Sequence, residues 1–218
     1  VVAYSPISSG THTDTIVLEY FDGVITKNTS RDLTGIGADP ASISISDGPS
    51  YSYGNVAVGG SKDKTFTLTN TGGVPATSMA GSGLALPYRF KGGSYPGTGG
   101  DCGATLANGS SCTVVVAFLP TATGNFTDTV QINYNDGVTA QQGQRDVSGD
   151  GVLSAFLAIS DGPSFDYGIL AIGNNSDHTF TVQNTGGLQA TTMSGTGLAA
   201  PFTFKGGSYP GTGGTCSA

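Results

Sequence analysis

The sequence predicts an all-β protein built from two-layer β-sandwiches that repeat along the chain. Three observations support this prediction. Apolar and polar side chains alternate over short stretches, and Gly-rich turns separate those stretches. No stretch shows the 3.6-residue period of an amphipathic helix. Residues 1–104 align without a gap with residues 115–218, an offset of 114 residues, and more than half of the aligned positions are identical.

The strand pattern of one unit begins after position 40. Ile43 and Ile45 alternate with serines, and the apolar set continues through residues 53–58. Residues 64–69 then read Lys-Thr-Phe-Thr-Leu-Thr, which is the alternation of a half-buried strand. The Asn-Thr-Gly-Gly sequence at 70–73 predicts the turn that ends this strand.

The second half of the unit carries the clearest strands. Val114, Val116 and Phe118 lie at alternate positions over 112–118, and the strongest period of two lies at 126–134. Asn-Asp-Gly at 135–137 predicts a hairpin, with a return strand that extends to about residue 148. Roughly seven to nine short strands per unit, each with one apolar face, predict a two-sheet sandwich.

The repeat also predicts the domain boundaries. The Gly-rich linkers at 35–40 and 149–154 occupy equivalent positions. Residues 1–40 are therefore expected to be the closing strands of a first unit. Residues 41–152 form one complete unit, and residues 153–218 supply the opening strands of a third.

Composition and charge exclude several classes of partner. Only 11% of the residues are charged, the net charge is −7, and the eight basic residues form no cluster. Binding to phosphate backbones needs grouped Lys and Arg, so no nucleic acid partner is expected. The longest strongly apolar run, Val114–Leu119, is too short for a membrane span, so no membrane insertion is expected.

The three cysteines follow the repeat. Cys102 and Cys112 lie in one unit, and Cys216 is the second copy of Cys102. The equivalent of Cys112 would lie beyond residue 218, so we interpret Cys216 as orphaned by truncation. A Cys102–Cys112 disulfide would place the protein in an oxidising compartment, extracellular or at the cell surface, whereas two free thiols are the alternative.

A Gly-rich loop is the most unusual local feature. Gly92–Gly100 and Gly206–Gly214 are identical in sequence, but neither carries the Gly-Lys-Ser/Thr of a phosphate-binding loop. The loop is either a purely local structure or a contact surface between units or subunits. The candidate contact residues are Lys91, Tyr95, Lys205 and Tyr209.

The sequence gives no support for an enzyme, a metal site or a cofactor. His12 aligns with Phe126 and His178 aligns with Lys64, so neither histidine recurs between units. Neither has the spacing of a metal-binding motif, and no Gly-x-Ser-x-Gly nucleophile motif is present.

The positions of the carboxylates are typical of turns and not of catalytic or metal-binding sites. Six of the fourteen aspartates stand beside glycine, a turn position where an aspartate can bond its own backbone. Asp146–Gly151 faintly resembles the start of a calcium loop, but Leu157 stands where a bidentate Glu is needed. Glu19 is the sole glutamate, so the Lys–Asn isopeptide bonds of some pilin sandwiches, which often use a nearby Glu, are not expected.

Several motifs resemble a known family. Thr69–Gly72, the C-x9-C spacing of Cys102 and Cys112, and Phe118–Gly124 are similar to bacterial surface repeats of the choice-of-anchor D type. Those repeats are grouped with abnormal-spindle and hydin-like immunoglobulin repeats. The resemblance covers all three units. It implies tandem immunoglobulin-like β-sandwiches on a secreted or surface-attached protein, and no catalytic residues.

These observations predict a non-catalytic structural protein of an extracellular fibre, stalk or sheath. The expected partners are copies of itself or flanking repeats of a longer chain. The ends are either a window on a longer array or half-domains that complete each other head-to-tail, which would polymerise the chain by strand addition. The alternative function is an immunoglobulin-like binding module for a glycan or protein, with Tyr95 and Tyr209 as possible aromatic platforms.

Overall fold

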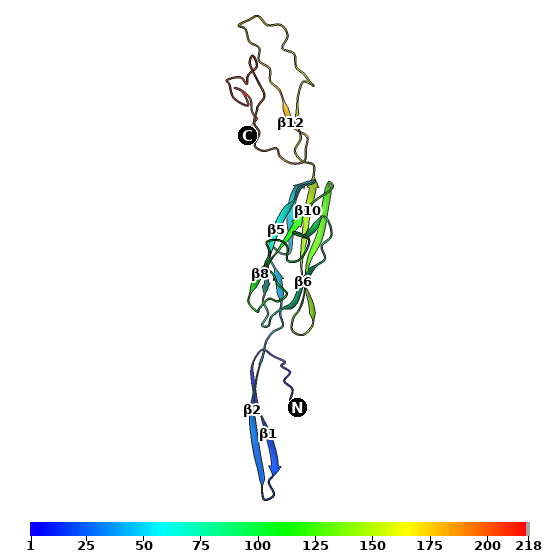
Figure 1. The fold of residues 1–218 in the computed structure, drawn as a ribbon, viewed down its shortest axis with the longest axis vertical. Coiled ribbons are helices and arrows are strands. Elements are labelled where there is room, and N and C mark those ends of the chain that lie inside the picture. Colours follow the sequence, from blue (N-terminus) through cyan, green and yellow to red (C-terminus); the bar gives the residue numbers. More distant parts are fainter. Residues whose placement is uncertain (217–218) are drawn as a thin grey trace. The chain divides into compact units, whose positions relative to one another are not determined.

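The computed structural model describes residues 1–216, and this range contains twelve β-strands and no helix (Figure 1). The all-β prediction is therefore confirmed. The strands are β1 (Gly10–Phe21), β2 (Thr26–Gly37), β3 (Ile43–Ile45), β4 (Ser50–Ala57), β5 (Lys62–Asn70), β6 (Thr77–Ser82), β7 (Tyr88–Phe90), β8 (Ser111–Phe118), β9 (Gly124–Asn135), β10 (Ala140–Val152), β11 (Leu157–Ile159) and β12 (Val182–Asn184).

Strands β1 and β2 form an antiparallel hairpin by themselves. The register pairs Gly10 with Gly37 and Phe21 with Thr26 across the turn. The Oδ1 atom of Asp22 closes this turn by accepting hydrogen bonds from the backbone N–H groups of Val24 and Ile25, each at 2.9 Å. An aspartate that bonds the backbone in this way is the turn chemistry that the Asp-Gly sequence predicts.

Strands β3 to β10 form two four-stranded sheets. One sheet has the order β3-β5-β8-β7 and the other has the order β4-β10-β9-β6. The neighbours β5 and β8 are antiparallel, with Phe66 opposite Val114. Eight strands between residues 43 and 152 agree with the expected seven to nine. This non-sequential strand order requires connections that cross from one sheet to the other, as in Greek-key sandwiches.

Aromatic side chains fill the space between the two sheets. Tyr53 from β4, Tyr88 from β7 and Phe118 from β8 are each at most 1% exposed. The rings of Tyr88 and Phe118 stack at 4.7 Å, and Tyr53 lies 5.6 Å from each of them. The Tyr53 hydroxyl donates a hydrogen bond of 2.9 Å to the Val116 carbonyl, so Tyr53 links the two sheets by packing and by a hydrogen bond. Burial raises the pKa of Tyr53 well above its ordinary value.

The segment after β10 contains two short strands. Leu157–Ile159 pairs antiparallel with Val182–Asn184, and Ile159 lies opposite Val182. These strands match β3 and the last three residues of β5 at the 114-residue offset. Within residues 153–216, the equivalents of β4, β6 and β7 are not strands. The opening strands expected here are therefore present only in part.

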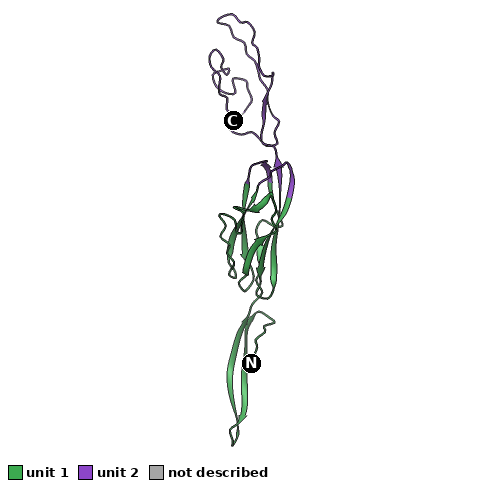
Figure 2. Cartoon of the chain, turned by 45° about the vertical axis from the view of Figure 1, so that its right-hand side comes forward, with its two compact units in different colours: residues 1–53, 62–118, 127–148 green, residues 54–61, 119–126, 149–218 purple. Residues whose placement is uncertain are grey.

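The structure divides into two compact units (Figure 2). One unit comprises residues 1–53, 62–118 and 127–148, and the other comprises residues 54–61, 119–126 and 149–218. Within the second unit, Val58 donates its N–H to Val152 at 2.8 Å, and Gly59 donates to Pro120 at 2.9 Å. The predicted boundaries at residues 40 and 152 stay predictions.

Candidate functional site

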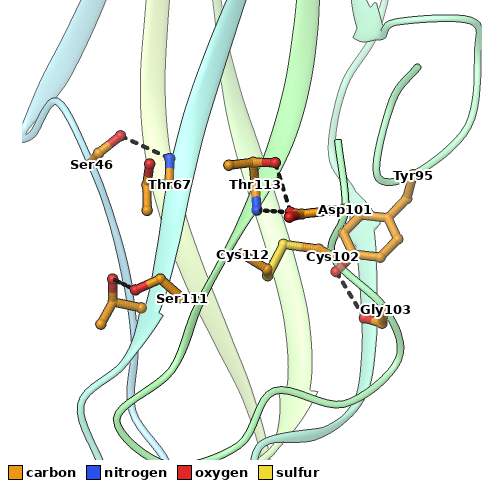
Figure 3. The surroundings of a disulfide bond; sticks show 10 residues. Ser46, Thr67, Tyr95, Asp101, Cys102, Gly103, Ser111, Cys112 and Thr113 are labelled. Carbon is orange, nitrogen blue, oxygen red and sulfur yellow. Dashed lines mark hydrogen bonds between the residues drawn. A yellow bond between two sulfur atoms is a disulfide. The ribbon is translucent and has the colours of Figure 1, made fainter. Parts of the chain in front are cut away.

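The disulfide lies in the connection between β7 and β8. Cys102 bonds to Cys112, the second residue of β8, and both are buried (Figure 3). The prediction of a disulfide at this pair is confirmed. Cys216 is a free cysteine and is half-buried.

The Gly-rich loop between the same strands is hydrogen-bonded to β8. Lys91 donates its N–H to the Val115 carbonyl at 2.9 Å, and Val115 donates its own N–H to Pro96 at 2.8 Å. Gly97 has a φ of 89°, and a Cβ there would lie 2.2 Å from the Val115 oxygen, so only glycine allows this approach. The loop thus covers the outer face of β8, where Val115 and Ala117 are also buried.

A second set of hydrogen bonds holds the end of the loop beside the disulfide. The carboxylate of Asp101 accepts hydrogen bonds from the N–H and the hydroxyl of Thr113, at 2.6 and 2.7 Å (Figure 3). The Thr113 carbonyl in turn accepts hydrogen bonds from the N–H groups of Asp101 and Cys102. The two Thr113 hydrogen bonds lower the pKa of Asp101 below its ordinary value of 3.8.

Tyr95 is held inside this structure. Its ring lies edge-on to Phe90 at 5.8 Å, and its hydroxyl donates to the Gly103 carbonyl at 3.2 Å (Figure 3). Gly81 of β6 makes room for the pair, since a Cβ there would lie 2.3 Å from Phe90 and 2.7 Å from Tyr95. Tyr95 is half-buried, which raises its pKa to about 12. Its ring therefore packs against Phe90 and is partly exposed, and its role as an aromatic platform stays a prediction.

Lys91 lies at the surface of the loop. Its Nζ atom is 2.7 Å from the carboxylate of Asp63, and the two side chains are 45% and 39% exposed. An exposed pair of this kind contributes about 0–1 kcal/mol to stability. Of the predicted contact residues in the central sandwich, Lys91 is the accessible one.

The second copy of the loop reproduces two of these contacts. Lys205 lies 2.6 Å from Asp177, and Phe204 lies edge-on to Tyr209 at 5.7 Å. Cys216, which has no disulfide, stands where Cys102 stands in the first copy. Both contacts are therefore present in a copy of the loop whose cysteine is free. Whether either copy of the loop is a contact surface stays a prediction.

Asn70 is an important residue that the sequence analysis did not single out. It is fully buried, and its Oδ1 atom accepts the N–H groups of Ser42 and Gly72. Its Nδ2 atom donates to the carbonyls of Val74 and Leu106, at 2.9 and 3.2 Å. Every donor and acceptor of its amide is thus used to join three segments. Its recurrence as Asn184, within the same Asn-Thr-Gly-Gly turn, was the signal that could have identified it.

The histidines and the aspartates of β10 take part in local contacts. His12 is 2.7 Å from the Tyr4 hydroxyl, and His178 is 3.1 Å from Asp161. Asp146 and Asp150 lie in strand β10, where they accept hydrogen bonds from side chains of β9. Residues 1–216 contain no cluster of three or more His, Cys, Asp or Glu side chains placed to hold a metal ion.

No helix within residues 1–216 is long and apolar enough to cross a bilayer.

Comparison with known proteins identifies the fold of the central segment. Residues 47–150 match the family model described as the HYDIN/CFA65/VesB-like, Ig-like domain. No curated protein sequence matches the chain significantly. The finer resemblance to choice-of-anchor D repeats stays a prediction.

Three solved structures are similar to parts of the chain. The VesB protease of Vibrio cholerae has 17% identity and a TM-score of 0.40, with 51% of this chain and 32% of that chain covered. A protein of unknown function from Porphyromonas gingivalis W83 has 13% identity and a TM-score of 0.39, covering 67% and 68%. The ASH / PapD-like domain 7 of human CEP192 has 17% identity and a TM-score of 0.38, covering 54% and 88%.

These identities and TM-scores support no inference about activity or partners. The chain also spans only 32% of the VesB protease. The strand order of β3 to β10 and the family match agree on the class of the central segment. Residues 47–150 form an immunoglobulin-like domain.

Proposed function

We propose that this chain is a non-catalytic structural part of an extracellular fibre, stalk or sheath built from tandem immunoglobulin-like repeats. The observation that carries the proposal is the recurrence of contacts at the 114-residue offset. The Asp63–Lys91 ion pair recurs as Asp177–Lys205, at 2.7 and 2.6 Å. The hydrogen bond from Thr129 to Asp146, 2.8 Å, likewise recurs from Thr15 to Asp32 at 2.8 Å. Serial copies of one module suit a spacer or fibre.

The disulfide supports the extracellular part of the proposal. Bonds such as Cys102–Cys112 persist in oxidising compartments and are rare where thiols are kept reduced. The net charge of −7 and the scarcity of basic residues favour protein partners over nucleic acid or anionic membranes. We therefore expect the partners to be copies of the same module.

The β1–β2 hairpin supports head-to-tail assembly. Leu18 and Tyr20 are 59% and 49% exposed, whereas their equivalents Ile132 and Tyr134 in β9 are 0% and 8% exposed. The same apolar face is thus buried against a second sheet in one copy and open to water in the other. Covering it with strands from a neighbouring copy would remove an apolar surface that is costly to leave exposed.

The test is the assembly state of the 218-residue chain across a range of concentrations. Light scattering after size exclusion, together with negative-stain electron microscopy, should show linear particles whose mass rises with concentration. Leu18→Asp should shift the distribution to monomers, because it places a charge on the open face. Glu19→Ala, on the opposite face of the same strand, is the matched control and should assemble like the parent chain.

Denaturing electrophoresis shows whether the subunits of an assembly are joined covalently or noncovalently. Assemblies that separate into monomers on denaturing, non-reducing electrophoresis support noncovalent completion of half-domains. A chain that stays monomeric at every concentration, with Leu18→Asp behaving identically, contradicts the assembly proposal.

A further inference from the structure

An aspartate ties the turn after β3 to strand β5, and we call this contact the carboxylate tie. Asp47 lies 2.7 Å from the Nζ atom of Lys64 and accepts a 2.6 Å hydrogen bond from the Ser46 hydroxyl. The Ser46 N–H donates to the Thr67 carbonyl at 2.9 Å, and the Thr67 N–H donates to the Ser46 hydroxyl at 3.0 Å (Figure 3). The φ of Asp47 is 61°, a left-handed conformation that a residue other than glycine keeps only where its contacts hold it. The turn therefore depends on the bonds of this carboxylate.

The carboxylate tie recurs 114 residues later with a different partner for the aspartate. Asp161 has a φ of 70° and accepts a 2.5 Å hydrogen bond from the Ser160 hydroxyl. Ser160 and Thr181 form the same two backbone contacts, at 2.9 and 3.0 Å. His178 stands where Lys64 stands, and its Nε2 atom lies 3.1 Å from the Asp161 carboxylate. A histidine thus replaces the lysine in an otherwise repeated set of contacts.

Both partners of the aspartates lie against an aromatic ring. The Nζ atom of Lys64 is 4.6 Å from the ring centroid of Tyr51, and a cation in this position is attracted by the ring face. The imidazole of His178 stacks on Phe165, with the ring centroids 3.8 Å apart. The two side chains of the pair are 23% and 33% exposed in the central sandwich, and 28% and 36% exposed in the second copy. The site is therefore alike in the closed sandwich and in the segment after β10.

The imidazole is the one group of these sites whose ordinary titration range lies near neutral pH. The hydrogen bond from Lys64 contributes most to lowering the pKa of Asp47, and the charge of Arg145 in β10 lowers it further. The residues before Lys64 and His178 form separate ion pairs, Asp63–Lys91 and Asp177–Lys205. Aspartate, lysine and arginine ordinarily keep their charges between about pH 5 and 8, whereas an imidazole changes its charge in this range.

We infer that the carboxylate tie is a pH-sensitive switch at residues 160–181 and is insensitive to pH over the same range in the central sandwich. An imidazole ordinarily carries its second proton below about pH 6.5. When protonated, His178 forms an ion pair with Asp161, as Lys64 does with Asp47. The neutral ring can still donate one hydrogen bond, but the attraction between opposite charges is lost. Because the protonated form makes the pair, its contribution is present at low pH and is lost as the pH rises.

The experiment measures amide hydrogen exchange of the 218-residue chain at about pH 5.5 and about pH 7.5, on either side of the ordinary imidazole range. Mass spectrometry with electron-transfer fragmentation resolves single amides in dilute samples, and protection factors remove the intrinsic effect of pH on exchange. The N–H groups of Ser46 and Thr67 are the central reporters, and those of Ser160 and Thr181 are the second reporters. Protection of the second reporters should fall about two- to fivefold at the higher pH, the range of an exposed ion pair, while the central reporters stay constant.

Exchanging the two residues should exchange the two behaviours. Lys64→His should make the central reporters sensitive to pH, within a sandwich that is otherwise unchanged. His178→Lys should make the second reporters insensitive. His12→Phe is the matched control, because it replaces the other histidine by the residue found at its counterpart, Phe126, and it should leave both sets of reporters unaltered.

Two results would overturn the inference. One is a parent chain whose second reporters keep the same protection at both pH values. The other is a Lys64→His chain whose central reporters do not respond to pH. The inference does not rest on the proposed function, since every contact of the carboxylate tie lies within one chain and is measured in dilute samples.

Discussion

The central sandwich and the segment after it contain closely similar sequences in two different environments. Phe66 in β5 is fully buried, whereas Phe180, its counterpart 114 residues later, is 40% exposed. Tyr88 is 1% exposed and its counterpart Phe202 is 54% exposed. The difference shows that the alternating pattern specifies which side chains can enter a core, while the closing strands β8 to β10 determine whether that core forms.

Contacts between residues that are close in sequence, in contrast, are the same in the two copies. The edge-on contact of Tyr51 and Tyr53, at 5.1 Å, recurs between Phe165 and Tyr167 at 5.0 Å. Neighbours in sequence therefore keep their arrangement without a closed core. Burial differs between the two copies, because it depends on residues that are distant in sequence.

The largest effect expected from this comparison concerns Phe66 and Phe180. Phe66→Ala should destabilise the central sandwich by about 3–5 kcal/mol, because it leaves a cavity in a fully buried site. Phe180→Ala, the matched control, should cost less than about 1 kcal/mol, since its ring is already partly in water. Urea unfolding, followed by tyrosine fluorescence, measures both. Equal losses at the two positions would contradict the environments described above.

Much of the central domain could be predicted from the alternating residues. Val130, Ile132 and Tyr134 were expected on one face of a strand, and each is buried there. The alternation in β8 predicted only one buried face, yet Val115 and Ala117 on the other face are also buried. A Gly-rich loop covers them, and only the tertiary structure brings that loop to β8. A period of two describes a strand with one covered face and cannot show that a distant loop covers the other.

The candidate site was predictable to a lesser degree. The pairing of Cys102 with Cys112 followed from the repeat, because it accounted for all three cysteines. The inward position of Tyr95 did not, because it depends on Gly81 in a strand of the other sheet and on the Gly103 carbonyl. Such contacts arise from the three-dimensional path of the chain, and no local sequence pattern encodes them.

The second-largest effect concerns the Cys102–Cys112 disulfide and the free Cys216. Replacing both Cys102 and Cys112 by Ser should lower stability by about 2–3 kcal/mol, because the bond closes a loop with a sequence separation of 10. Cys216→Ser should leave unfolding of the central sandwich unchanged. Thermal unfolding with and without a reducing agent measures both variants. A transition that stays insensitive to reduction in the parent chain would contradict a stabilising role for the bond.

Asn70 and Asn184 provide the third test. Asn70→Ala should cost about 1–3 kcal/mol, since it leaves buried N–H and carbonyl groups without partners. Asn184 makes equivalent contacts with Phe156, Gly186 and Leu188, but it is exposed, so water can replace a lost amide. Asn184→Ala should therefore have little effect on the same chemical denaturation curve. A larger loss at Asn184 than at Asn70 would reverse the comparison.

The smallest expected effect concerns the hairpin turns that close β9–β10 and β1–β2. The backbone N–H groups of Thr139 and Val138 donate to Asp136 and lower the pKa of its carboxyl below the ordinary 3.8. A carboxyl whose pKa is lower in the folded state than in the unfolded state stabilises the fold at pH values above its unfolded-state pKa. That contribution is lost as the pH falls through its folded-state pKa. Asp136→Asn should therefore flatten the fall in stability of the central sandwich below about pH 4, the range set by such carboxyl pKa values.

Asp22 is the matched control for this last prediction. The backbone N–H of Ile25 and the side chain of Lys27 lower its pKa in the equivalent turn. Its hairpin nevertheless exposes the apolar face that β9–β10 buries, so Asp22→Asn should leave the acid unfolding of the central sandwich unchanged. Asp47 and Asp101 also have lowered pKa values, because of their hydrogen bonds to Lys64 and Thr113. Acid sensitivity should consequently decrease in Asp136→Asn without disappearing, and an unaltered pH profile would show that this turn does not couple to the core.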